Sequence, residues 1–392
     1  MDLKYSYQYF RLTDEQVNQL KNSDDADSLC QLGCWYVFTV PTDDYVDRAA
    51  DCFRKAIEEG SVEAKLHLAN MYRLGDFGYV DMKEYKRLRN EAMSAGYQPA
   101  AMRYCSDIAY GVGFVPNLDA AIAEVQKWMV RFDNPDPRWF DLLGWMYYTK
   151  EDGDGFEKSN RLFQKAIEKG YIDSYIGLED VPDSYEKGRA AGCADCCLLI
   201  AYDLEKRYLD LFSDTAKAVE DFSNDDDKRA FLKANADDRA GLEKEITALF
   251  DEAVKMGSVA VYYELGCMYR EGKFGHKVNN KKAWDNFKRG SELGSPLCFT
   301  MMSLMAEEGS APNDCGKDDA RLLRLKALRY GDEEQLSAVI KDYLNGDLEE
   351  YAEEIVQNYV PIYESLNDES PDETDEDDDD YEDDDGRWDA WA

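Results

Sequence analysis

The stretch VYYELGCMYREGKFGHKVNNKKAWDNFKRGSELG, residues 261–294, decides the fold of this chain, because its pattern recurs along most of the sequence. The segment FDEAVKMGSVAVYYELGCMY, which leads into it, corresponds to FRKAIEEGSVEAKLHLANMY at residues 53–72. Further copies read LRNEAMSAGYQPAAMRYCSDI, FQKAIEKGYIDSYIGL and FKRGSELGSPLCFTMMSLMA, and a weaker one reads LLRLKALRYGDEEQL. Internal repeats of this kind decide a fold before any local pattern does.

One glycine punctuates each copy at a nearly constant interval. Gly60 and Gly96 are 36 residues apart, and Gly257, Gly294 and Gly331 follow one another at intervals of 37. A period this regular, kept while the side chains around it change, predicts one supersecondary unit stacked on copies of itself.

Each unit has the pattern of two helices joined at that glycine. Phe53, Ala56 and Ile57 recur at three- and four-residue spacing, as one face of a helix requires. Gly60 can take the left-handed conformation that ends a helix, and a second apolar series begins at Ala64. We therefore expect an all-α fold, a right-handed α-solenoid of antiparallel helix pairs.

A second glycine recurs inside the helix that follows the punctuating glycine, in LGCWY at 32–36, LGWMY at 143–147 and LGCMY at 265–269. A glycine in a helix interior costs about 1 kcal/mol relative to alanine. Its return at one phase predicts that a neighbouring helix packs closely there.

These residues resemble the Sel-one-like repeat family of the tetratricopeptide superfamily. That pattern is roughly A-x-x-L-G-x-x-Y, a glycine-containing loop, a lysine–alanine step, an aromatic and then A-x-x-G, and LGCMYREGKFGHKVNNKKAW and WDNFKRGSELG match its two halves. The resemblance covers roughly residues 27–332, and the observed period exceeds the 34 residues of a plain tetratricopeptide unit. The chain departs from the pattern where Ala69, Cys105 and Ser303 replace the mid-helix glycine.

The chain divides into six predicted segments. They are a capping helix at 1–26 with Thr13 and Gln16 spaced as a capping box, a repeat array of four to five helix pairs at 27–202, a helical insertion at 203–242, further repeats at 243–332, C-terminal capping helices at 333–365, and a disordered acidic tail at 366–392. The tail is expected to be disordered because high charge with almost no aliphatic residues leaves nothing to offset chain entropy.

The charge of the chain is strongly negative, with 83 acidic against 46 basic residues and a net charge of −37. Such a field repels nucleic acid and anionic lipid and favours a basic protein partner. No apolar run reaches membrane-spanning length, and the N-terminus lacks the pattern of a secretory signal. The ten cysteines are interpreted as reduced thiols, so we expect a cytoplasmic protein that binds neither membrane nor nucleic acid directly.

The cysteines invite a metal interpretation that the spacing does not favour. The run CADCC at 193–197 lacks the second pair that a four-ligand zinc site usually has. His67 and His276, the two histidines of the sequence, belong to other repeats, and Cys30 and Cys34 lie one helical turn apart on an apolar face. We expect core packing of the cysteines, with no metal and no cofactor.

Catalytic signatures are absent from the sequence. It contains no H-E-x-x-H, no G-x-S-x-G, no Walker loop and no G-x-G-x-x-G after a strand. Two histidines in 392 residues leave little material for acid–base chemistry. We expect no catalytic residues and no enzyme.

The resemblance implies that the first helix of each pair lines a concave face that binds a protein segment. Aromatic and arginine side chains are favoured in such contacts. Asn70, Arg73 and Arg270 are expected to be exposed there, whereas Trp145 and Tyr148 either contact a partner or pack on the next helix. Carried onto this sequence, the positions on the concave face are Asn70, Arg73, Ser106, Tyr110, Trp145, Tyr148 and Arg270.

The C-terminal tail places a dense acidic run before Trp388 and Trp391. It is either a solubilising segment or a docking segment in which the tryptophans fill a pocket and the acids meet a basic rim. The resemblance in physical type is to the docking tail of bacterial single-stranded-DNA-binding proteins.

The function predicted from these features is a protein-interaction adaptor or scaffold that holds a basic partner. The alternative is an acidic nucleic-acid-mimicking inhibitor or immunity protein that blocks a basic site on a nuclease, toxin or DNA-handling protein. The affinity of a mimic would fall steeply with salt, and that of a groove led by apolar burial would not. The oligomeric state stays open.

Overall fold

The computed structural model describes residues 12–39, 45–112, 115–150, 153–178, 181–221, 225–312 and 315–368. Every regular element in these ranges is a helix. None of the helices among the described residues combines the length and the apolar character that crossing a membrane requires. Residues 366–368, expected as the start of the disordered tail, belong instead to the last helix (Val360–Asp368), and the rest of the tail, with Trp388 and Trp391, lies outside these ranges.

Most helices associate as consecutive pairs, and the expectation of an all-α array of helix pairs is confirmed. Before the pairs comes α2 (Asp14–Lys21), and after them come η2 (Glu333–Gln335), α18 (Leu336–Leu344), η3 (Glu349–Tyr351), α19 (Ala352–Asn358) and α20 (Val360–Asp368). The pairs are α3 (Ala26–Thr39) with α4 (Tyr45–Glu58), α5 (Glu63–Leu74) with α6 (Met82–Ser94), α7 (Gln98–Tyr110) with α8 (Leu118–Met129), α9 (Arg138–Thr149) with α10 (Gly155–Glu168), η1 (Ile172–Gly177) with α11 (Ser184–Ala191), α12 (Cys196–Asp221) with α13 (Asp225–Met256), α14 (Val261–Glu271) with α15 (Asn280–Glu292), and α16 (Pro296–Glu307) with α17 (Lys317–Tyr330).

The punctuating glycines end the second helix of a pair in the way that the sequence predicts. Gly60, Gly257 and Gly331 have φ angles of 97°, 99° and 111°, in the left-handed region. After Gly60 and Gly257, the next N–H turns back to the final helical turn, with Ser61 N 2.7 Å from Ala56 O and Ser258 N 2.9 Å from Ala253 O. These bonds satisfy carbonyl groups that a helix end would otherwise leave open.

The glycines inside the first helices make room for phenylalanine rings. A Cβ atom on Gly33 would lie 2.6 Å from Phe53 Cε1, and one on Gly266 would lie 2.2 Å from Phe287 Cε1. Gly144 faces Phe163 in the same way. In all three pairs the ring comes from the second helix, so the predicted close approach is the seam that holds the two helices of a pair together.

The N-terminal helix α2 carries the predicted capping box. Thr13 N donates to Gln16 Oε1 at 2.8 Å, and Gln16 N donates to Thr13 Oγ1 at 3.3 Å. Leu20 then packs against the apolar cluster that α3, α4 and α5 share. The helix thereby covers the first pair of the array.

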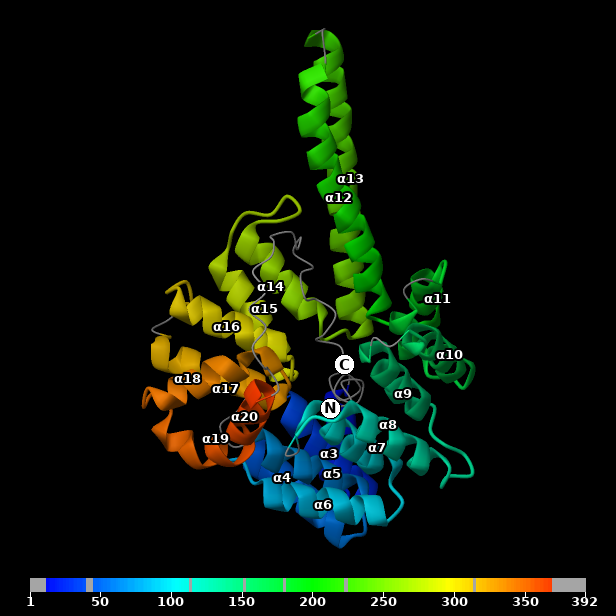
Figure 1. Cartoon of the computed structure of the whole chain (residues 1–392), viewed down its shortest axis with the longest axis vertical. Coiled ribbons are helices and arrows are strands. Elements are labelled where there is room, and N and C mark those ends of the chain that lie inside the picture. The colour runs from blue at the N-terminus through cyan, green and yellow to red at the C-terminus, as the bar shows by residue number, and fades with distance from the viewer. Residues whose placement is uncertain are drawn as a thin grey trace.

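Of residues 203–242, expected as an insertion between repeats, 203–221 and 225–242 are the outer parts of α12 and α13. The inner parts of the same two helices form a repeat core, in which Leu198 and Ala201 share a cluster with Ile246, Phe250 and Ala253. Figure 1 shows this hairpin projecting from the body of the molecule. The extra residues therefore lengthen one helix pair and leave the repeat series uninterrupted.

The array curves until its C-terminal helices meet its N-terminal ones. Figure 1 shows the helices after α16 beside α3 to α6, and α17 contacts α5 directly. Helices α17 to α20 have an apolar cluster of their own, around Leu325, Val339 and Ile355. The structure is therefore a nearly closed arc, with a contact between segments about 250 residues apart in sequence, as the bond from Arg73 to Arg329 shows.

Candidate binding surface

The predicted contact residues of α5 lie under the C-terminal helices. Asn70 and Arg73 are 9% and 8% exposed, so the expectation that they are exposed is wrong. Arg73 Nη1 donates to the carbonyl oxygen of Arg329 at 3.1 Å. The part of the inner face formed by α5 is thus covered by the chain itself.

Arg329 is the centre of this closing contact. Its Nε and Nη2 atoms donate to Glu354 Oε1 and Oε2 at 2.8 and 2.6 Å, a bidentate pair buried between α17 and α19. The guanidinium also lies against the end of α5, where a Cβ atom on Gly75 would be 3.0 Å from Nη1 of Arg329. Gly75 has a φ of 73°, so both the backbone and the approach of Arg329 require glycine there.

Further ionisable groups surround the pair. Burial raises the pKa of Asp76 to about 7, although Arg329, Arg73 and Lys326 oppose the rise. Burial also lowers the pKa of Lys326, with Arg329 contributing, and raises the pKa of Tyr330. The closing contact is therefore built from charged and polar groups that have lost water, and such groups stabilise a contact less securely than apolar ones.

Tyr110 of α7 belongs to the same region. Burial raises its pKa to about 12, and the carboxylates of Glu333 in η2 and Asp141 in α9 contribute. Within the described residues, Tyr110 Oη, Asn70 Oδ1 and Arg73 Nε have no hydrogen-bond partner. These three atoms are therefore buried without a protein partner among the described residues.

Three predicted residues lie apart from the closing contact. Trp145 packs edge-on against Tyr148, with ring centroids 5.6 Å apart, and lies 5.0 Å from the ring of Phe163. Both side chains are half-buried, so they pack on the helices of their own pair and keep part of their surface in solvent. Arg270 Nη2 bonds Glu308 Oε1 and Oε2 at 2.8 and 2.9 Å, which ties α14 to the end of α16.

Ser106 makes a local contact. Its hydroxyl donates to the carbonyl oxygen of Met102 in its own helix at 3.1 Å. This bond back to the preceding turn satisfies the hydroxyl without any other element.

Two buried ion pairs were not predicted from the sequence. Arg329 pairs with Glu354, and Arg89 pairs with Asp107 between α6 and α7, with the Tyr85 hydroxyl on the same carboxylate. A signal for Arg89 exists, because it falls on the apolar face of α6 that Tyr85 begins. A charged residue on the core face of a helix predicts a buried partner, although the sequence does not say which one.

The cysteines of the run at 193–197 are buried, as core packing predicts. Cys196 and Cys197 are fully enclosed, and Cys197 belongs to the cluster at the base of the hairpin. A Cβ atom on Gly188 would lie 2.4 Å from Cys196 Sγ, so α11 packs closely on this sulfur. The burial of these three cysteine side chains agrees with a role in core packing.

The sequence matches no family model and no curated protein. Among solved structures, it is similar to a protective antigen of uropathogenic Escherichia coli with an SLR fold, at 15% identity and a TM-score of 0.33, covering 96% of this chain and 88% of that one. It is also similar to a Sel1 repeat protein from Oxalobacter formigenes, at 18% identity and a TM-score of 0.33, covering 86% of this chain and 93% of that one. Both descriptions name the kind of repeat that the Leu-Gly and Ala-x-x-Gly pattern of this sequence resembles.

Proposed function

We propose that this protein is a non-enzymatic interaction scaffold that binds a basic protein partner in the cytoplasm. The observation that carries the proposal is that the basic side chains pair with carboxylates within the chain, while a large excess of carboxylates stays without a basic partner. Basic side chains are engaged by carboxylates of the same chain: Arg89 by Asp107, Arg138 by Asp136, Arg189 by Glu252, Arg270 by Glu308 and Arg329 by Glu354.

The acidic groups greatly outnumber these cations. With 83 acidic and 46 basic residues, at least 37 carboxylates have no basic side chain of their own to pair with. The molecule therefore presents a negative field whose complement is a basic surface, and the same field works against direct binding of nucleic acid.

The proposed partner contacts follow from what the closing helices leave accessible. Trp145 and Tyr148 keep part of their rings in solvent, and rigid aromatic side chains of this kind are common anchors in protein interfaces. Asn70, Arg73 and Tyr110 become available to a partner only when the C-terminal helices move away from α5. Trp388 and Trp391 are proposed as a second anchor in the tail, with its acids around the rim of the partner's pocket.

The test is capture of partners by the full-length chain from its native cell, followed by affinity measurement on the purified partner. We expect a basic protein whose affinity falls at least tenfold in the double variant Trp145→Ala with Tyr148→Ala. The matched control is Tyr79→Ala, which removes an aromatic ring that is 55% exposed elsewhere in the chain. A partner without a basic surface, or equal losses in variant and control, would contradict the proposal.

The salt dependence separates the scaffold from a nucleic-acid mimic. Burial of aromatic anchors predicts a modest change in affinity between low and high salt, whereas imitation of a phosphate backbone predicts a loss of several powers of ten and competition by duplex DNA. A steep loss with DNA competition would favour the inhibitor or immunity protein over the scaffold.

A further inference from the structure

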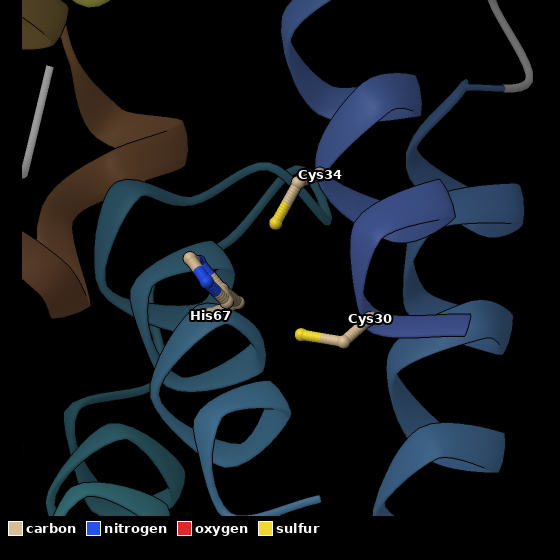
Figure 2. Close-up of side chains that lie close together, drawn as sticks. All are labelled: Cys30, Cys34 and His67. Carbon is tan, nitrogen blue, oxygen red and sulfur yellow. The ribbon is translucent and has the colours of Figure 1, made fainter. Parts of the chain in front are cut away.

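The first two repeats bring two cysteines and a histidine together. Cys30 and Cys34 lie one turn apart on α3, and Figure 2 shows both sulfur atoms directed toward the imidazole of His67 on α5. One ligand atom from each of the three residues lies within 4.8 Å of the others. His67 belongs to the repeat after that of Cys30 and Cys34, and the stacking of the two repeats brings it beside these cysteines, for which the sequence predicts core packing alone.

The repeat itself explains the meeting. His67 follows Cys34 by 33 residues and Cys30 by 37, which is about one period of the array. In a stacked solenoid, positions one period apart lie side by side on neighbouring first helices. The three side chains thus occupy equivalent faces of adjacent units.

Neighbouring side chains hold the imidazole in place. Gly33, between the two cysteines, admits the ring of Phe53, because a Cβ atom there would lie 2.6 Å from Phe53 Cε1. His67 stacks on the same ring, with centroids 5.4 Å apart and planes 15° from parallel. The plane of the imidazole is therefore fixed by the seam of the first repeat.

A carboxylate stands beside the histidine. Glu63 Oε1 lies 3.6 Å from His67 Nε2, one helical turn away on α5. Histidines that bind metals commonly have a carboxylate next to the ring, which orients it and makes it a better ligand. Glu63 adds a feature that simple core packing does not require.

We propose that Cys30, Cys34 and His67 bind a zinc ion, with Glu63 beside the imidazole. Two thiolates and one imidazole bind zinc in preference to harder cations, and three protein ligands leave a fourth position for water. Tetrahedral zinc places such ligand atoms about 3.5 to 3.8 Å apart, given bond lengths of about 2.0 to 2.3 Å. Binding would therefore draw ligand atoms that lie within 4.8 Å of one another closer by about 1 Å.

The site is accessible and has a structural consequence. Both cysteines are buried, whereas the side chain of His67 is 20% exposed and gives an ion a route from solvent. The ion would join α3 of the first pair to α5 of the second and so stabilise the start of the array. Because the thiols release protons on binding, the affinity should increase with pH.

The experiment is zinc and cobalt titration of the full-length protein, stripped of metal and kept reduced. We expect one ion per chain, a cobalt spectrum with thiolate charge-transfer bands, and a rise in melting temperature on adding zinc. Cys34→Ser and His67→Gln should each weaken binding more than tenfold, and Glu63→Gln should weaken it by about tenfold or more. Circular dichroism without metal checks that each variant folds.

The matched control is Cys105→Ser, a fully buried cysteine of α7 that lies outside this cluster and should leave zinc binding unchanged. Binding of less than one zinc per chain, equal affinity in Cys34→Ser and Cys105→Ser, or binding of Cu(I) without zinc would overturn the assignment.

Discussion

Glycine has two different structural roles in this chain. Gly60 and its equivalents supply a left-handed turn, whereas Gly33, Gly144 and Gly266 supply space for a ring from the partner helix. At Gly33, Gly144 and Gly266 no side chain larger than hydrogen fits, because protein interiors are packed too tightly to accept an extra methyl group.

Gly266→Ala should destabilise the protein by about 1 to 3 kcal/mol, since its Cβ would lie 2.2 Å from the buried ring of Phe287. Gly241→Ala is the matched control in an exposed helical position with nothing within 4 Å, and it should stabilise by about 0.5 to 1 kcal/mol. Urea denaturation of both variants measures the difference. Equal effects of the two substitutions would mean that the seam is not tightly packed.

The raised pKa of Asp76 predicts that the stability of the fold depends on pH. Its pKa in the folded protein is about 7 and its ordinary value is 3.8, so the folded state holds this proton more tightly than the unfolded state. The stability that this group contributes is fully present below about pH 4 and is lost as the pH rises through about 7.

Asp76→Asn removes this titration, so the melting temperature of the wild type should fall relative to that of the variant between about pH 5 and 8. Thermal denaturation across that range measures the difference. A constant difference between the two proteins would show that Asp76 is not desolvated beside Arg73, Lys326 and Arg329.

Among the elements, the α12–α13 hairpin differs most from its sequence-based prediction. The charged composition of residues 203–242 indicates helices on a solvated surface, and both helices form there. What the pattern does not show is continuity with the repeat, because the apolar core at Leu198, Ile246 and Phe250 ends within the base of the hairpin. Farther out along the hairpin there is no core to impose an apolar spacing, so the sequence does not show that these residues continue the repeat.

The outer hairpin should be removable. Asn235 Nδ2 lies 3.5 Å from the carbonyl oxygen of Leu211, so a short glycine-rich loop can join these positions in place of residues 212–234. We expect the shortened protein to keep its helical fold and a melting temperature within a few degrees of the wild type, measured by circular dichroism. Loss of the fold would show that the outer hairpin stabilises the body.

In the whole molecule, the helix pairs could be predicted from the sequence and the closure could not. The glycine period and the apolar spacing around Phe53 and Phe287 are local signals, and so is the Thr13–Gln16 capping box. The contact between Arg73 and Arg329 depends on small rotations added over many repeats, and no local pattern records their sum. For the same reason the burial of Asn70 required the structure. The approach of His67 to Cys30 and Cys34 is a contact between adjacent repeats, one period apart in the sequence.

The closing contact is also the reason why the inner face is only partly available. It joins two separately cored ends of the array through Arg73, Asp76, Lys326, Arg329 and Glu354. Buried charges make a contact that depends on each partner being present, so loss of one group should weaken it strongly. We therefore expect that a substitution at this contact exposes more of the inner face of α5 without unfolding a repeat.

A double-mutant cycle between Asp76→Asn and Arg329→Met tests this closure most directly. Unfolding free energies are measured at pH 8, above the pKa of Asp76, with Asp76→Asn and Arg189→Met as the control pair, because Arg189 pairs with Glu252 on another part of the array. A closed array predicts a coupling energy of about 1 kcal/mol or more for the first pair and none for the control. A coupling of zero for both pairs would contradict the closed structure.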